Sequence, residues 1–498
     1  MKIFPKIATL ILGVVLAFGF VSCELETDNS LALLLFALST EKDCTITFDA
    51  NGGTINTTTQ TVKPRVKSPL KSASELELNR ADYVFMGWST KADSAKAEYN
   101  DEAEVILNGD ITLYAVWLSL KPLTLEFIQS GNLIIRRQWS TLKYSLNGGP
   151  IKDATETIAV AAGDKVCLYA EKSEYPTIGT FQSIDCTADC YIYGNIMSLV
   201  THTGNGKWNP LETTLKQDYT FQRLFSVNYK IKNHDTELLC LPATTLTRSC
   251  YGEMFYGCKN LKKAPALPAE TLVEDCYRGM FRYCRGLTEC PILSSTTLAK
   301  YCYAYMFDTC ESLEVAPELP AKTLVDYCYQ DMFYGCKSLK TAPELPAEDL
   351  AFCCYFNMFA ECTSLTKAPK LPAKKLAEWC YGHMFSRCSS LSAAPELPVE
   401  ELVDCCYMDM FEKCTSLTTA PVLPAKTLVH GCYQEMFLGC SNLNSIKCLA
   451  TDVSKNNCTD NWLYNVSSSG TFIKAKDMTS WGSGDGGIPT GWTVVDAE

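Results

Sequence analysis

The chain has 498 residues, enough for about three or four domains at roughly 100–200 residues each. Apolar residues make up 47% of it and charged residues 20%, a balance that excludes an intrinsically disordered chain. The net charge of −12 excludes nucleic acid as an expected partner, because nucleic-acid binding requires basic surface.

The first segment reads MKIFPKIATLILGVVLAFGFVSC and predicts a targeting sequence. Two lysines, an apolar stretch at 7–20 and a small residue precede Cys23. A Cys in this place resembles the lipobox of bacterial lipoproteins, which implies a signal peptide over 1–22, a lipidated Cys23 and a linker over 23–43. An ordinary cleaved signal or an uncleaved anchor is the alternative. No later apolar run reaches the roughly 20 residues that span a bilayer.

Residues 44–117 carry a second set of motifs. TITFDANGGTI reads as an alternating strand that enters an Asn-Gly-Gly hairpin turn, and YVFMGWST and ITLYAVW follow. Together they resemble the Listeria–Bacteroides repeat, the B-repeat type of internalin-like surface proteins, although Asp82 stands where that family has Gly. The resemblance implies a small β-grasp-like fold in the cell envelope and a stalk or adhesive role. The expected core aromatics are Phe85, Trp88, Tyr114 and Trp117.

Residues 118–200 predict several alternating strands, in LTLEFIQ, NLIIRRQ, LKYSLNGG and DKVCLYAEK. A β-sandwich-like domain is the economical interpretation. Residues 201–218 read as a linker. The cysteines expected as disulfide candidates lie here and near the C-terminus: Cys186 with Cys190, and Cys448 with Cys458.

A 26-residue unit repeats over 219–443. It reads C-Y-x-x-M-F-x-x-C-x-x-L-x-x-A-P-x-L-P-A-x-x-L and occurs eight times, from Cys250 to the copy that begins at Cys432, after a degenerate first coil. A fixed period predicts a solenoid in which each coil buries its apolar side chains against its neighbours. Residues 444–498 predict a C-terminal cap with short strands.

Within one unit, apolar residues at offsets 0, 4, 5, 8, 9 and 12 indicate one face of a helix, and the Pro-ended segment indicates a short strand. This pattern resembles the BspA-like leucine-rich repeats of bacterial surface proteins, although that family has Ile-x-Ile-Pro in a shorter unit. The expected fold class is therefore multidomain α+β. It combines a β-grasp-like repeat, a β-sandwich-like domain and a leucine-rich-repeat-like solenoid with a helix and a short strand per coil.

His383 lies between two cysteines of one unit and raises the question of a metal or redox site. The same position holds Glu, Gly, Tyr, Asp or Asn in other units, as expected for a solvent-facing helix position. Metal binding needs four converging ligands, and each unit offers only two Cys. Coils stack about 4.8 Å apart whereas disulfide Cβ atoms lie about 3.8 Å apart, so buried free thiols are favoured over disulfides. The sequence predicts no metal and no cofactor.

The sequence favours a binding protein over an enzyme. It has four His, and no H-E-x-x-H or G-x-S-x-G motif. We expect adhesion, or binding of a host or bacterial surface protein or glycan, through the solenoid of a protein lipid-anchored in the cell envelope, on the outer membrane surface. A passive structural spacer is the alternative. Solenoids bind along extended faces, and the candidate face is the column Glu318, Glu344, Lys370 and Glu396.

Overall fold

A computed structural model describes most of the chain beyond the N-terminal segment. The described residues are 42–136, 139, 141–170, 182–202, 207–479, 481–484 and 486–498. The predicted signal peptide, Cys23 and most of the following linker lie outside them. Within these ranges, no helix has the length and apolar character needed to cross a bilayer.

The first domain is a mixed four-stranded sheet. Its strands are β1 (Cys44–Asp49), β2 (Thr59–Val62), β4 (Tyr83–Ser89) and β6 (Ile111–Ser119), in the order β2-β1-β6-β4. The two central strands, β1 and β6, run parallel, and the outer pairs are antiparallel. β3 (Ser68–Pro69) and β5 (Glu104–Val105) form a separate small ladder. Trp88 is fully buried against Phe48 and Phe85, and Asp82 adopts a φ of 63°, the left-handed region that glycine favours.

The second domain consists of two sheets and covers one end of the solenoid. The larger sheet contains β7 (Thr124–Phe127), β9 (Leu142–Leu146), β10 (Lys152–Asp153), β12 (Lys165–Ala170) and β14 (Cys190–Asn195). The smaller contains β8 (Gly131–Arg136), β11 (Thr157–Val160) and β13 (Ser183–Cys186). β14 also pairs in parallel with β15 (Ile231–Asn233) and β16 (Leu239–Cys240) of the degenerate first coil. The hydrophobic core therefore continues from this domain into the repeats.

The predicted α+β fold class, with one helix and one short strand per coil, is wrong. Between β16 and the strands at the C-terminal end, neighbouring coils share isolated parallel bridges in place of a strand. The only helix in the described residues is a single 3-10 turn, η1 (Ile196–Leu199). In each repeat the residues around the C-Y-x-x-M-F-x-x-C stretch form a run of turns, which we call the turn segment; it spans 248–257 in the first regular coil. There, Met254 N donates to Tyr251 O (3.2 Å), three residues back, while Glu253 N donates to Arg278 O of the next coil (2.8 Å). Alternate amides thus bond within a coil and between coils, whereas an α-helix bonds every amide four residues back.

The spacing of the buried residues explains this difference. The buried pairs recur at a period of four, as in Cys250–Tyr251, Met254–Phe255 and then Cys258. In a helix of 3.6 residues per turn, each four-residue step drifts by about 40°, so three steps drift by about 120° and the apolar stripe leaves the core. The turn segment keeps a true period of four, because every fourth residue, such as Glu253 with a φ of 51°, takes the left-handed conformation that a type II turn needs at its third position.

Identical side chains stack into ladders along the solenoid. The Tyr column from Tyr251 to Tyr433 has ring centroids 5.7–6.2 Å apart, and the parallel Phe column from Phe225 to Phe437 has centroids 5.5–5.8 Å apart. Four parallel strands end the stack: β17 (Thr419–Leu423), β18 (Ser445–Cys448), β19 (Thr471–Lys474) and β20 (Thr493–Asp496). Trp462 continues the aromatic stack beyond the regular repeats, with its ring 6.4 Å from that of Tyr433.

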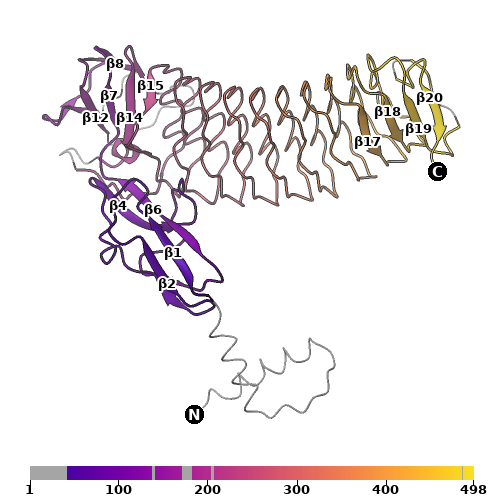
Figure 1. Ribbon diagram of the computed structural model, residues 1–498. Helices are drawn as coiled ribbons and strands as arrows, with labels where there is room; N and C mark the ends of the chain where they lie inside the picture. Colours follow the sequence, from indigo (N-terminus) through magenta and orange to yellow (C-terminus); the bar gives the residue numbers. More distant parts are fainter. Residues whose placement is uncertain are drawn as a thin grey trace, which may run out of the picture.

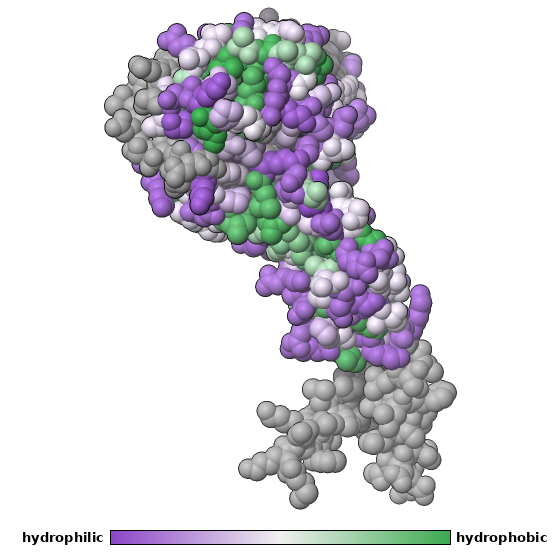
Figure 2. Space-filling model, turned by 90° about the vertical axis from the view of Figure 1, so that its left-hand side faces the viewer, coloured by the Kyte–Doolittle hydropathy of each residue, from purple (hydrophilic) through white to green (hydrophobic). Residues whose placement is uncertain are grey.

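The three parts form one elongated body with a side arm (Figure 1). The solenoid runs from the two-sheet domain to the C-terminal strands, and the β1–β6 domain projects from beneath the first coils. Figure 2 shows the end covered by the two-sheet domain, where hydrophobic residues form small groups broken up by hydrophilic ones. The hydrophobic end of the stack is thus covered by the chain itself.

Candidate functional site

The predicted binding residues form one row on the strand side of the solenoid. Parallel backbone bridges join Val315 to Thr341, Thr341 to Lys367, and Lys367 to Ala393. Three positions after these bridges, each coil presents an exposed side chain in the same register: Glu318, Glu344, Lys370 and Glu396. We call this row the strand face. The constant 26-residue period keeps it straight, since each coil repeats the same path.

The β1–β6 domain covers one end of the strand face. Lys91 Nζ lies 2.9 Å from Glu318 Oε2, and Lys96 forms an ion pair with Glu270 two coils earlier. These contacts join residues more than 170 positions apart in the sequence. Exposed pairs of this kind contribute about 0–1 kcal/mol each, so they orient the domain without locking it.

A more buried junction holds the same domain near its base. Tyr83 Oη donates to Glu237 Oε2 (2.9 Å) and accepts from Leu238 N (2.9 Å), and Lys121 pairs with the same glutamate (2.5 Å). Burial raises the pKa of Tyr83 to about 12, and the hydrogen bond to Glu237 acts in the same direction. The phenol therefore stays protonated and keeps its role as donor at neutral pH.

The rest of the strand face is open. Within the part of the chain that the structure describes, Glu344, Lys370 and Glu396 form no ion pair, and all three are exposed. Two carboxylates thus flank one ammonium group along neighbouring coils. The open part offers an alternating charge pattern to a partner, and the next position in the same register holds the exposed Val422.

The repeat cysteines are free thiols, as predicted. The second thiol of each coil points at the carbonyl of a Phe in the preceding coil, as in Cys362 Sγ to Phe333 O (3.1 Å) and Cys388 Sγ to Phe359 O (3.0 Å). Burial raises the pKa of the ladder thiols, to about 12 for Cys388. The described residues contain no group of three or more His, Cys, Asp or Glu that could hold a metal ion.

The four disulfide candidates are also free in the structure. Cys190 Sγ lies 3.5 Å from Cys186 Sγ as a pair of hydrogen-bonded thiols, and Cys448 and Cys458 are each unpaired by a disulfide. Neither candidate pair forms a disulfide in the structure. The hydrogen bond with Cys186, together with burial, raises the pKa of Cys190 above its usual range.

His383 is less exposed than predicted. Its Nε2 atom lies 3.6 Å from Asp409 Oδ2 of the next coil, and its ring meets Phe356 edge-on at 5.2 Å. Burial lowers the pKa of His383. The reason is the turn segment, in which this column lies in a shallow row between neighbouring coils instead of on the outer side of a helix.

Sequence reasoning missed a line of buried acids along the turn segments. Burial and the nearby Glu435 and Glu412 raise the pKa of Asp409 to about 7, and burial beside Asp308 raises the pKa of Asp331 to about 6. Asp308 itself pairs with Arg282 at 2.7 Å. The four-residue period was the signal that could have placed these side chains between coils.

Comparisons with known families match two parts of the chain. The model of the Listeria–Bacteroides repeat domain matches residues 45–116, and the model of the BspA type leucine-rich repeat region matches 241–366 and 355–480, with six copies. No curated protein and no solved structure matches the chain. BspA-type repeats are typical of bacterial surface proteins with repeat-mediated binding, and such repeat families are generally not catalytic.

The two matches lie on the segments whose motifs carried the resemblance, and each coincides with a distinct part of the fold: the β1–β6 sheet and the stacked coils. The chain is therefore a BspA-like leucine-rich repeat protein with an N-terminal Listeria–Bacteroides repeat.

Proposed function

We propose that this protein is a cell-envelope lipoprotein that adheres, without catalysis, to a host or bacterial surface protein or glycan through its solenoid. The lipid on Cys23 would hold the N-terminal side at the outer membrane surface. The strand face would carry the contact, through the open residues Glu344, Lys370 and Glu396.

The observation that supports this proposal most is the rigidity of the strand face. Backbone bridges and two aromatic ladders hold neighbouring coils in one register. A ligand chain lying along such a row meets the same geometry at every coil. Weak charged contacts then add by avidity, both along one molecule and over many copies on a cell.

A passive spacer is the second candidate, and the composition of the strand face favours it. Binding hot spots are enriched in Trp, Tyr and Arg, whereas the row from Glu318 to Glu396 holds only Glu and Lys. In addition, the Listeria–Bacteroides repeat already occupies the Glu318 end. A spacer needs the stiffness of the stack but no partner on this face.

Adhesion of a non-adherent bacterium that displays the protein distinguishes the two. We would compare the full chain, a chain without 219–498, and the double variant Glu344→Lys/Glu396→Lys. Glu318 stays unchanged, because its substitution would also break the contact with Lys91. The control is Asp326→Lys/Asp404→Lys, which changes the net charge equally at exposed positions of the turn segments.

The proposal predicts adhesion to host matrix or to other bacteria for the full chain and its loss without the solenoid. The strand-face double variant should change adhesion, whereas the control should not. Unchanged adhesion after deletion of the solenoid would show that the contact lies elsewhere. A full chain that adheres to none of the surfaces offered would favour the spacer.

A further inference from the structure

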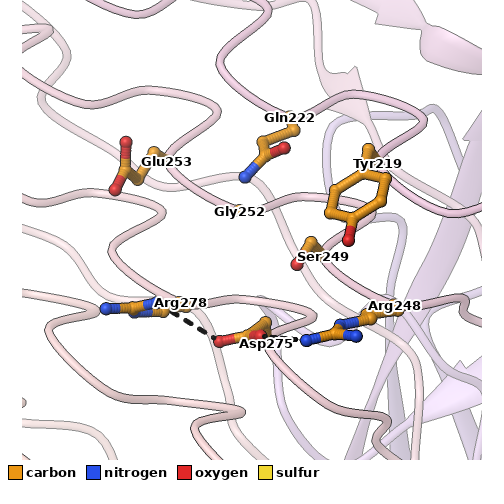
Figure 3. Close-up of a pocket in the computed structure, with 8 residues that line it drawn as sticks. All are labelled: Tyr219, Gln222, Arg248, Ser249, Gly252, Glu253, Asp275 and Arg278. Carbon is orange, nitrogen blue, oxygen red and sulfur yellow. Dashed lines mark ion pairs between the residues drawn. The ribbon is translucent and has the colours of Figure 1, made fainter. Parts of the chain in front are cut away.

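A small polar pocket opens on the turn segments at the start of the solenoid. Its volume is about 180 Å³, and three successive coils form its walls (Figure 3). The ring of Tyr219 and the amide of Gln222 lie on one side, and a row of Arg248, Asp275 and Arg278 lies on the other, with Gly252 between them. The turn segments and the strands enclose the core between them, so this pocket is on a different surface from the strand face.

The pocket exists because Gly252 has no side chain. The same column holds Arg278, Ala304, Gln330, Phe356, Gly382, Met408 and Gln434 in the later coils. In the sixth regular coil the equivalent space over Gly382 is filled by the ring of Phe356, 3.1 Å from where a Cβ would be. At Gly252 a Cβ would meet nothing closer than 3.4 Å. A Cβ at Gly252 would therefore sit in ordinary van der Waals contact with Ser249 and Gln222, and the lack of a longer side chain there leaves the pocket between Tyr219 and Arg278 unfilled.

Two side-chain oxygens of lining residues, Gln222 Oε1 and Asp275 Oδ1, are shielded from solvent behind the pocket wall and have no hydrogen-bond partner among the described residues. The carboxylate of Asp275 lies between two guanidinium groups. Its Oδ1 atom is 3.6 Å from Arg278 Nη1, and its Oδ2 atom is 3.8 Å from Arg248 Nη2. Both distances exceed the roughly 2.7–3.2 Å of a direct hydrogen bond. A hydroxyl group can donate to a carboxylate and accept from a guanidinium, and buried acceptors gain from such a donor.

The ion-paired side chains around the pocket balance one another in charge, and Asp218, which accepts from Arg248 N (3.1 Å), adds one exposed carboxylate at the edge. Arg248 also bonds to Glu274 (3.3 Å), and Glu253 pairs with Arg223. Three guanidinium groups therefore face three carboxylates: Arg223, Arg248 and Arg278 against Glu253, Glu274 and Asp275. A charged ligand would leave one charge uncompensated, so the pocket suits a neutral ligand with several hydroxyl groups.

The volume of the pocket and its aromatic wall further restrict the class of ligand that it can bind. A cavity of about 150 Å³ holds one benzene ring, so about 180 Å³ suits a single six-membered ring. The Tyr219 ring offers a flat apolar surface to C–H groups. Arg278 is held in place at the rim by the rings of Tyr301 and Tyr305, whose centroids lie 5.3 and 5.6 Å from its guanidinium carbon.

We propose that this pocket binds one neutral pyranose unit, such as a terminal sugar of a glycan. Its C–H face packs on Tyr219, and two neighbouring hydroxyls bridge Asp275 and Arg278. This site is independent of the strand face, and its failure would leave the adhesion proposal untouched. With one small ring and few contacts, the dissociation constant is on the order of 1 mM, which corresponds to about 4 kcal/mol.

Ligand-observed NMR and calorimetry on the full-length protein test the proposal, with methyl glucoside, methyl galactoside and methyl mannoside as probes. Gly252→Gln should abolish binding by filling the pocket; Gln already occurs in this column, at 330 and 434. Asp275→Asn should weaken binding about tenfold, which is about 1.4 kcal/mol. Gln222→Ala should also weaken it, whereas the matched control Gln434→Ala, in the same column far from the pocket, should change it less than about twofold.

Thermal melts of each variant ensure that a loss of binding is not a loss of folding. Two results would overturn the assignment to this pocket: no binding of any of the three glycosides at millimolar concentration, or binding that Gly252→Gln leaves intact. Tighter binding of methyl glucuronide than of the neutral glycosides would overturn the inference that the ligand is neutral.

Discussion

Removing one ring from the Phe ladder tests how the solenoid is held together. Phe359 is fully buried, and its ring lies between those of Phe333 and Phe385 at centroid distances of 5.6 and 5.8 Å. Phe→Ala in a core costs about 3–5 kcal/mol. Two stacked pairs, each contributing about 0.5–1.5 kcal/mol, are lost with the ring. We therefore expect Phe359→Ala to lower the free energy of unfolding by about 4–5 kcal/mol, the upper part of that range.

The control is Phe356→Ala, a change of the same size in the same coil. Phe356 is only half-buried and touches Trp379 and His383 at its edge. Its loss should cost about 1 kcal/mol, as for an ordinary partly exposed site. Urea denaturation followed by far-UV circular dichroism measures both. Because repeat arrays can unfold in more than one step, the transition should also be followed by tryptophan fluorescence. If the two variants lowered the free energy of unfolding equally, the Phe ladder would not be the main source of the solenoid's stability.

Three further predictions follow from buried or terminal groups. The sixteen ladder thiols should resist alkylation in the native state and react after denaturation, as mass spectrometry can count; rapid native alkylation would contradict their burial. Asp409, with its pKa raised to about 7, contributes stability that is present at low pH and lost as the pH rises through 7. The melting temperature of Asp409→Asn should therefore rise relative to that of the wild type between about pH 5 and pH 8. Melting temperatures of the two proteins that change in parallel with pH would refute this. Radiolabelled fatty acid should enter the wild-type protein and not Cys23→Ala; equal labelling would argue against the lipobox.

The sequence predicted the stacking but not the local backbone. A period of 26 residues with invariant Cys, Tyr, Met and Phe columns requires identical environments in successive coils, so ladders of rings and thiols follow from it. The apolar offsets also fit a short helix, because over a few residues a period of 4 and a period of 3.6 look alike. Residues in the left-handed conformation, such as Glu253 and Asp331, distinguish the period of 4 from the period of 3.6. Neither residue type predicts that conformation from the sequence.

The candidate sites differ in how much of each could be predicted from the local sequence pattern. The strand face could be written down from the sequence, since its members recur at one offset in each unit. The contact between Lys91 and Glu318 could not, because it depends on how two separate domains meet. The pocket at Gly252 could not be predicted from the sequence either, since its walls come from three coils and depend on a missing side chain rather than on a motif.

The thiol ladder has a consequence for how this chain reaches its folded form. Once folded, each second thiol is protonated and directed at a Phe carbonyl of the preceding coil, as Cys414 is at Phe385 (3.0 Å), so it is protected from oxidants. Before folding, the same cysteines are exposed at an ordinary pKa and spaced closely along the chain. A disulfide formed at that stage would tie together residues that the finished stack holds apart, and the coils on either side could not close. In any oxidising compartment, the chain must therefore fold faster than its cysteines form disulfides.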